Sequence, residues 1–204
     1  MSSSLFSTTV DEVLLEYGRL RLYSRFLEDK EASDFFNRLQ QQVSWRQDAL
    51  VFAGKKVAIP RLQAWFGDEG ARYTYSGLTL NPELWTPDLH VLKTKIEFLT
   101  GLTFNSLLAN YYRDGCDSIA WHSDDEPELG RNPVIASLSL GATRRFVLKR
   151  KAKNKHLKYE LNLSSGSLLI LDGELQHHWQ HSIPKTKLFV EPRINLTFRK
   201  IINI

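Results

Sequence analysis

Hydrophobic and polar positions in the first hundred residues predict one strand followed by two amphipathic helices. Residues 18–27 alternate between apolar and polar side chains, as a half-buried strand does. Residues 32–43 instead carry apolar side chains at helical spacing: Ala32, Phe35, Phe36, Leu39 and Val43. A second helix is predicted from Pro87 to Gly101, with Thr86 as N-cap and an apolar stripe of Leu89, Leu92, Ile96 and Leu99. We expect both stripes to pack against a sheet and the first dozen residues to form a loose terminus.

After Gly101 the pattern changes to short strand-like segments separated by turn signals such as Asp114-Gly115 and Asp172-Gly173. Seven segments are rich in Leu, Ile, Val and aromatic residues: 104–112, 134–140, 144–150, 159–163, 167–173, 178–183 and 192–200. Candidate strands without an intervening helical pattern predict an antiparallel sandwich or barrel. We therefore expect a mostly β (α+β) fold in a single domain, 1–204, with an N-terminal extension (1–100) and a jelly-roll core (101–204).

Composition allows a sizeable core and narrows the class of protein. Hydrophobic residues make up 42% of the chain and aromatic residues 11%, which argues against disorder. The formal charge of +4 is compatible with a polyanionic partner, although many soluble enzymes are as basic. A single cysteine, Cys116, excludes an internal disulfide and fits a reducing compartment. Because no signal peptide and no apolar run of about 18 residues is present, we expect a soluble intracellular protein without a membrane partner.

Near the C-terminus, residues 193–199 would place all their polar side chains on one face of a strand. Alternation puts Ile194, Leu196 and Phe198 on one face and leaves the other to Arg193, Asn195, Thr197 and Arg199. A half-buried surface strand with its polar face in water is one interpretation. A pocket wall that binds an anion is the other, because a guanidinium pairs bidentately with a carboxylate.

A candidate metal site is formed by His122 and Asp124, two residues apart, with a histidine from the cluster His177, His178 and His181. Two histidines and one carboxylate on one side of an ion leave the opposite coordination positions open, which suits Fe(II) in oxygen-using enzymes. Taken alone, an H-x-D triplet is as compatible with a solvated turn. The histidine cluster and the two-arginine strand that follow it favour the metal site, and with it the pocket interpretation.

Three motifs follow one another along the chain: H-x-D, a later histidine, and R-x-N-x-T-x-R. In this order they resemble the AlkB-type Fe(II)/2-oxoglutarate dioxygenases. The resemblance covers residues 50–201 and is closest to the branch that repairs alkylated double-stranded nucleic acid. Four segments carry it: NYYRDGCDSIAWHSDDE, PVIASLSLGATRRFVLKRK, GSLLILDG and PRINLTFRK. It implies a double-stranded β-helix (jelly roll) with N-terminal helices packed on the outer sheet and nucleotide-recognition elements within the first hundred residues.

The resemblance assigns roles to single residues. His122, Asp124 and His181 match the iron ligands; His181 is preferred over its neighbours because a small and an apolar residue follow it, and His177 and His178 would then be structural or lie near the site. Arg193 matches the partner of the far carboxylate of 2-oxoglutarate, and Arg199 matches the arginine near its metal-bound end. Four residues match the remaining polar lining of the family's 2-oxoglutarate pocket: Asn110, Tyr112, Asn195 and Thr197. For Tyr112, core packing is an alternative. The implied cofactors are Fe(II), 2-oxoglutarate as co-substrate and O2.

Residues 144–158 form a basic segment that contains no acidic residue: Arg144, Arg145, Lys149, Arg150, Lys151, Lys153, Lys155 and Lys158. Such a segment could contact several phosphates, and we take Arg144, Lys149 and Lys151 as candidate substrate contacts. A solvated hairpin tip and a nuclear-localisation signal are the alternatives.

Base recognition is predicted in three further places. Tyr73 and Tyr75 share a strand face, match the family's nucleotide-recognition strand, and could stack on a base turned out of the helix. Asp125 matches a residue at the base edge, with support of the metal ligand as its alternative. Phe52, within 49–56, lies where the duplex-repair branch has a hairpin with an apolar tip; a buried Phe52 is the other interpretation.

Together these features imply oxidative demethylation of N-alkylated bases, such as 1-methyladenine and 3-methylcytosine, in DNA. The reaction would couple to decarboxylation of 2-oxoglutarate and release formaldehyde, succinate and CO2. We expect a monomer, in the cytoplasm of a bacterium or the nucleus of a eukaryote. The alternatives are an oxygenase acting on RNA, protein or lipid, and a non-enzymatic DNA-binding module, which would not need the metal and arginine residues together.

Overall fold

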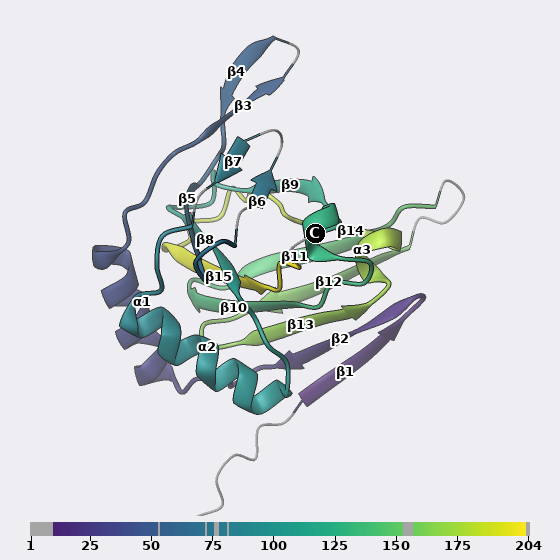
Figure 1. Cartoon of the computed structure of the whole chain (residues 1–204), viewed down its shortest axis with the longest axis horizontal. Coiled ribbons are helices and arrows are strands. Elements are labelled where there is room, and N and C mark those ends of the chain that lie inside the picture. The colour runs from purple at the N-terminus through teal and green to yellow at the C-terminus, as the bar shows by residue number, and fades with distance from the viewer. Residues whose placement is uncertain are drawn as a thin grey trace, which may run out of the picture.

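The computed structural model describes residues 10–52, 54–71, 73–75, 78–80, 82–152 and 157–202, with only the backbone described at 50, 52, 73–75 and 78–80. Two antiparallel sheets form the body of the molecule (Figure 1). The larger sheet has the order β1-β2-β13-β10-β15-β8-β5, with bounds Val10–Leu15, Gly18–Tyr23, Leu168–Gly173, Ile135–Gly141, Arg193–Arg199, Ser106–Tyr112 and Leu62–Gly67. The smaller sheet has the order β12-β11-β14-β9, with bounds Lys158–Leu163, Arg144–Arg150, Trp179–Ile183 and Ile119–His122.

The central strands of the larger sheet, β8, β10 and β15, are buried on both faces. On one face, helices α1 (Asp29–Gln42) and α2 (Pro87–Thr100) share a hydrophobic cluster with the strands, which includes Leu39, Ile96, Leu138, Leu196 and Phe198. On the other face a second cluster joins both sheets: Leu20, Tyr112, Ile135, Phe146, Leu148, Leu163, Leu169, Leu171, Trp179 and Ile183. The predicted jelly roll, with its helices packed on the outer sheet, is confirmed.

Both helices follow the predicted periodicity, and the ends of α2 also carry the predicted capping residues. The Thr86 hydroxyl accepts a hydrogen bond from the backbone N–H of Leu89 (3.3 Å), and Pro87 occupies the first turn of α2. Gly101 ends the helix with a left-handed backbone (φ 69°), which a residue without a Cβ adopts at little cost. An ion pair between Arg38 Nε and Asp88 Oδ2 (2.8 Å) links α1 to α2.

The expectation of a loose terminus was wrong from Val10 onward. β1 pairs along its whole length with β2, from Val10 opposite Tyr23 to Leu15 opposite Gly18. Most β1 side chains are exposed, so the strand is held by backbone pairing and leaves little hydrophobic signal in the sequence. Since β2 in turn pairs with β13, and β5 with β8, the larger sheet combines strands from before and after residue 100.

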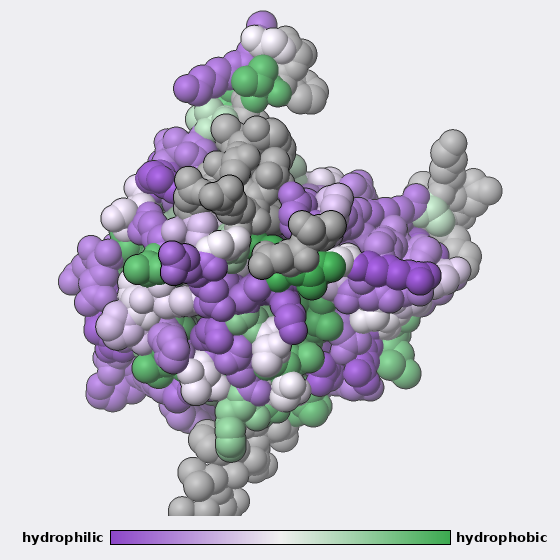
Figure 2. Space-filling model, in the orientation of Figure 1, coloured by the Kyte–Doolittle hydropathy of each residue, from purple (hydrophilic) through white to green (hydrophobic). Residues whose placement is uncertain are grey.

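Two small hairpins stand apart from the main sheets. β3 (Ala49–Phe52) pairs with β4 (Lys55–Ala58), and β6 (Tyr73–Tyr75) pairs with β7 (Leu78–Leu80). Figure 1 shows the β3–β4 hairpin projecting from the body, with β6 and β7 below it and next to β9. Hydrophobic and hydrophilic residues lie side by side on the projecting hairpin (Figure 2), where Val51 is 76% and Val57 52% exposed.

Two short helical elements complete the fold. A 3-10 turn (Pro127–Leu129) follows β9, and α3 (Leu175–His178) leads directly into β14. None of the helices in the described residues is long and apolar enough to cross a bilayer.

Candidate metal centre

Adjacent strands of the smaller sheet bring the predicted metal ligands together. His122, the last residue of β9, pairs in register with His181 of β14, and Asp124 follows two residues after His122. One candidate ligand atom from each of the three side chains lies within 4.8 Å of the other two. Of the histidine cluster, His181 is the one that lies beside His122 and Asp124, and the other two have different surroundings. His177 contacts the carbonyl of Arg131, and His178 stacks on Tyr17.

Hydrogen bonds orient His122 and Asp124. His122 Nδ1 lies 2.9 Å from the Ala120 carbonyl and donates to it, which leaves Nε2 for a metal. Asp124 Oδ1 accepts from Arg199 Nη2 (2.5 Å), whereas Oδ2 lies 3.7 Å from His181 Nε2. The backbone N–H of Asp124 donates to Gln176 Oε1 (3.0 Å). Sequence reasoning missed Gln176, whose position beside the histidine cluster was its only signal.

The electrostatic environment favours the protonation states that a divalent metal requires. Burial lowers the pKa of His181 to about 3, and His122 acts in the same direction. Burial also lowers the pKa of His122, with Arg199 and Arg61 adding to the effect and Asp124 opposing it. For Asp124, burial opposes ionisation, but Arg199 and the two histidines outweigh it and lower the carboxyl pKa. Near neutral pH the group is two neutral imidazoles and one carboxylate, a donor set that fits Fe(II).

A cavity beside the three ligands is lined by the polar face of β15 and by residues of both sheets: Leu108, Asn110, Tyr112, Ile119, Ile135, Ser137, Phe146, Leu171, Ile183, Arg193, Asn195, Thr197 and Arg199. The apolar side chains of the same strand, Ile194, Leu196 and Phe198, pack on the helix side. Residues 193–199 therefore form a pocket wall, and the half-buried surface strand is excluded; anion binding by this wall stays a prediction.

Arg193 gives this cavity the character of an anion site. Its side chain is buried (1% exposed), and Nη2 donates to Ser139 Oγ at 3.0 Å. Nε and Nη1 have no acceptor within the described residues. Burial lowers the pKa of Arg193 to about 10, and Tyr112, whose ring centroid is 5.2 Å from the guanidinium, opposes that shift. Buried donors are rarely left unpaired, so this guanidinium fits a carboxylate ligand.

The other predicted lining residues are partly held by one another. Asn195 Nδ2 donates to Ser137 Oγ (2.8 Å) and to the Leu138 carbonyl (3.1 Å), and the Thr197 hydroxyl donates to Asn195 Oδ1 (3.2 Å). Tyr112 lines the cavity and also belongs to the cluster between the sheets, so its two alternatives are not exclusive.

The basic segment is less uniform than its sequence indicated, and the prediction for Arg144 was wrong. Arg144 is 3% exposed and donates to the carbonyls of Asp114, Asp117 and Pro184, so its side chain is committed to holding loops inside the protein. Lys149 Nζ lies 4.4 Å from the Trp121 ring centroid at the surface. Lys151 Nζ donates to Asp125 Oδ2 (3.0 Å) and to the Gln176 carbonyl (2.8 Å), which links two of the predicted substrate residues.

Several predicted nucleic-acid contacts lie outside the described residues. These are Lys153 and Lys155 as a whole and the side chains of Phe52, Tyr73 and Tyr75. The backbone of the three aromatic residues is described. Phe52 is the last residue of β3, opposite Lys55, and the two tyrosines are the first and last residues of β6.

Comparison with known proteins identifies the family. The chain matches the model of the 2OG-Fe(II) oxygenase superfamily over residues 19–199. This chain belongs to that superfamily. Within it the chain is of the AlkB type. It is 46% identical over 192 residues to human alpha-ketoglutarate-dependent dioxygenase alkB homolog 3, covering 90% of this chain and 66% of the relative. It is 42% identical over 209 residues to the Bos taurus DNA oxidative demethylase ALKBH2, covering 95% and 75%.

The chain spans about two thirds of the length of the first of these curated relatives. Among solved structures, "The structure of OsALKBH1" matches with a TM-score of 0.63 and 17% identity, covering 93% of this chain and 100% of that one. At that identity the likeness shows the fold alone.

Proposed function

We propose that this protein is an Fe(II)- and 2-oxoglutarate-dependent dioxygenase that demethylates N-alkylated bases in DNA, with 1-methyladenine and 3-methylcytosine as the substrate class. The single observation that carries the proposal is the placement of His122, Asp124 and His181 beside a cavity that is also lined by the buried cation Arg193. The names of the relatives, which include DNA oxidative demethylase, support the choice of substrate.

In this proposal the three ligands hold the iron through two imidazole nitrogens and one carboxylate oxygen. Arg199 balances the buried carboxylate of Asp124 and leaves its second oxygen for the metal. His122 is kept in the tautomer with a free Nε2 by the Ala120 carbonyl. Because the ligands come from two paired strands and a backbone-anchored loop, the centre is preorganised before any metal binds.

The cavity would hold 2-oxoglutarate between the metal and Arg193. Arg193 would bind the far carboxylate through its unfilled donors, and Arg199 lies on the metal side of the same strand face. Asn110, Tyr112, Asn195 and Thr197 would supply the remaining polar wall. Apolar side chains, among them Leu108, Ile135 and Leu171, complete the lining and limit the entry of water.

When bound, the iron and 2-oxoglutarate supply the oxidising equivalents that hydroxylate an N-methyl carbon with O2, yielding succinate and CO2. The hydroxymethyl group then leaves the base nitrogen as formaldehyde. The chain's own task is to present the methyl group next to the centre and to exclude other substrates.

Substrate recognition is proposed for the surface beside the metal centre. Asp125 is exposed and directly follows the ligand Asp124, so its carboxylate could favour a positively charged, alkylated base. Such lesions pair badly and are cheaper to turn out of the duplex than a normal base. Phe52 remains a candidate for filling the gap that the flipped base leaves in the duplex. Tyr73 and Tyr75 remain candidates for stacking on that base, and Lys149 and Lys151 for contacts to the phosphates.

The test measures succinate and formaldehyde from the iron-loaded protein with four samples: methylated single-stranded DNA, methylated duplex DNA, methylated RNA, and no nucleic acid. We expect both products in near-equal amounts with methylated DNA and a low succinate background without it. Unmethylated DNA of the same sequence is the control. Succinate without formaldehyde in every sample would reject the substrate class but retain the oxygenase, and absence of both would reject the oxygenase.

A further inference from the structure

Arg61 is a buried cation outside the described cavity lining. It lies between the β3–β4 hairpin and β5 and is only 4% exposed. Its Nε donates to Asn110 Oδ1 at 2.6 Å, the one hydrogen bond that its side chain makes within the described residues. Burying a guanidinium is costly, so a bond of this length at a buried arginine points to a specific task.

The partner of Arg61 faces the cavity. Asn110 belongs to β8, is buried, and lines the cavity together with Arg193 and Arg199. An asparagine amide has an accepting oxygen and a donating nitrogen, and a rotation of 180° exchanges them. Arg61 can only donate, so it is compatible with only one of these two orientations. In that orientation the Asn110 oxygen turns toward Arg61 and the amide N–H groups turn away from it. Those N–H groups have no acceptor in the described part of the chain.

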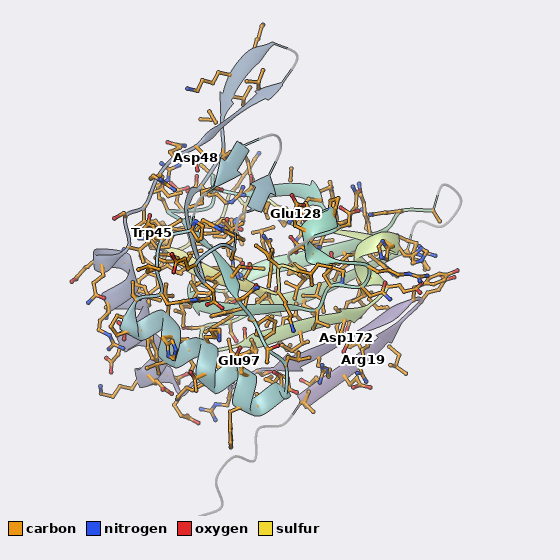
Figure 3. All side chains as sticks on the ribbon, in the orientation of Figure 1. Arg19, Trp45, Asp48, Glu97, Glu128 and Asp172 are labelled. Carbon is orange, nitrogen blue, oxygen red and sulfur yellow. The ribbon has the colours of Figure 1, made fainter. Side chains whose placement is uncertain are left out.

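The backbone around Arg61 is fixed on two sides. The Pro60 carbonyl accepts from the N–H of Ser118, in the segment that leads into β9 and its ligand His122. The Ile59 N–H donates to the Asp48 carbonyl, and the Asp48 carboxylate accepts from Gln63 Nε2 (2.8 Å). Figure 3 labels Asp48 near the base of the projecting hairpin. Arg61 is therefore held in place by the hairpin base, by β5 and by the approach to the metal centre.

We propose that Arg61 is a positioning residue that locks the Asn110 amide with its N–H groups toward the co-substrate pocket, so that they donate to a carboxylate of 2-oxoglutarate. This rests on the proposed function, because it takes 2-oxoglutarate as the ligand. With the amide rotated, an oxygen would face the dianion and repel it. Arg61 thus favours the binding of a dicarboxylate without touching it.

The experiment measures the dissociation constant of 2-oxoglutarate by calorimetry, with Mn²⁺ in place of Fe²⁺ and without nucleic acid, so that neither turnover nor DNA contacts contribute. Four variants are compared with the wild type: Arg61→Met, Arg61→Gln, Asn110→Ala and the double variant Arg61→Met/Asn110→Ala. Met removes the donor at nearly constant volume. Gln has its amide nitrogen the same number of bonds from the backbone as arginine Nε, so it keeps a donor and removes the charge.

We expect Arg61→Met to weaken 2-oxoglutarate binding about tenfold, the size of one hydrogen bond. Arg61→Gln should stay within about threefold of wild type, and the double variant should bind no more weakly than Asn110→Ala alone. Thermal unfolding of each variant checks that the fold is kept. If Arg61→Met is insoluble, Arg61→Leu, which also lacks a donor, replaces it alone and in combination with Asn110→Ala, with the same expected results.

Three results overturn the proposal. They are wild-type affinity in Arg61→Met, equal losses in Arg61→Met and Arg61→Gln, and additive losses in the double variant. Each of these leaves the proposed function intact, because the wild type still binds 2-oxoglutarate. If the wild type does not bind 2-oxoglutarate with Mn²⁺ or Fe²⁺, the proposed function itself fails.

Discussion

The cavity between the two sheets and the surface elements beside it are built in different ways. The cavity residues stand on central strands, where β15 pairs on both sides, with β10 and with β8, and each functional side chain has a neighbour that orients it. The β3–β4 and β6–β7 hairpins pair only with themselves in the described residues. A site formed by paired strands holds its geometry, whereas hairpins that stand apart can adapt to a large partner. The following variants separate these two regions.

The largest effect is expected at the metal centre. Asp124→Ala removes the only carboxylate of the ligand set and, with it, the ion pair to the buried Arg199. We expect metal binding and succinate formation to fall below detection, while circular dichroism still reports a folded β-rich protein. Lys30→Ala, on the exposed side of α1, is the matched surface control. Full activity in Asp124→Ala would exclude Asp124 from the ligand set.

Next in size is the loss of the buried anion site. Arg193→Met should raise the dissociation constant for 2-oxoglutarate by about two orders of magnitude, because two charge-assisted hydrogen bonds are lost. The same variant should unfold at an equal or higher temperature without ligand, because a buried cation with unfilled donors is replaced by an apolar side chain. Binding and stability are thus expected to move in opposite directions. Joint loss of both would show that Arg193 is structural.

A smaller effect concerns the loop that joins β8 to β9. Asp117 accepts from Arg113 Nε (2.8 Å) and from the Arg113 backbone N–H (2.9 Å). Burial opposes ionisation of Asp117, but Arg113 outweighs it and lowers the pKa of the carboxyl. The stabilisation is therefore present above the unfolded-state pKa and is lost as pH falls through the lower folded-state value. Asp117→Asn should cost about 1–3 kcal/mol at pH 7 and flatten the pH dependence of chemical unfolding below about pH 4.

The smallest effect is expected at the surface. Lys149→Ala should weaken the binding of duplex DNA a few-fold and reduce the slope of log K against log salt by about one, as one phosphate contact predicts. Binding of 2-oxoglutarate should not change. Lys30→Ala again serves as the control, since α1 lies on the helix-covered face. An unchanged slope would identify Lys149 as a solvated lysine packed on Trp121.

The sequence predicted the parts of this molecule whose pattern is local. The two helices carry their own periodicity, α2 also carries its caps, and β15 displays its two faces by alternation, so these elements could be predicted without a partner strand. What could not be predicted depends on contacts across the chain. Arg144 and Lys149 look alike in the basic segment, yet Arg144 is buried by carbonyls from two distant loops. Gln176 and Arg61 likewise have roles only through the partners that the fold brings to them.

Pairing of His122 with His181 across β9 and β14 also restricts how such a chain can change in length. Side chains alternate along a strand, so a single residue inserted within β14 before His181 would turn its imidazole away from the cavity. The connection between Ile183 and Arg193 has no such requirement. Insertions and deletions are therefore expected to be tolerated in that connection and eliminated from the paired strands, whatever nucleic acid the outer surface has come to bind.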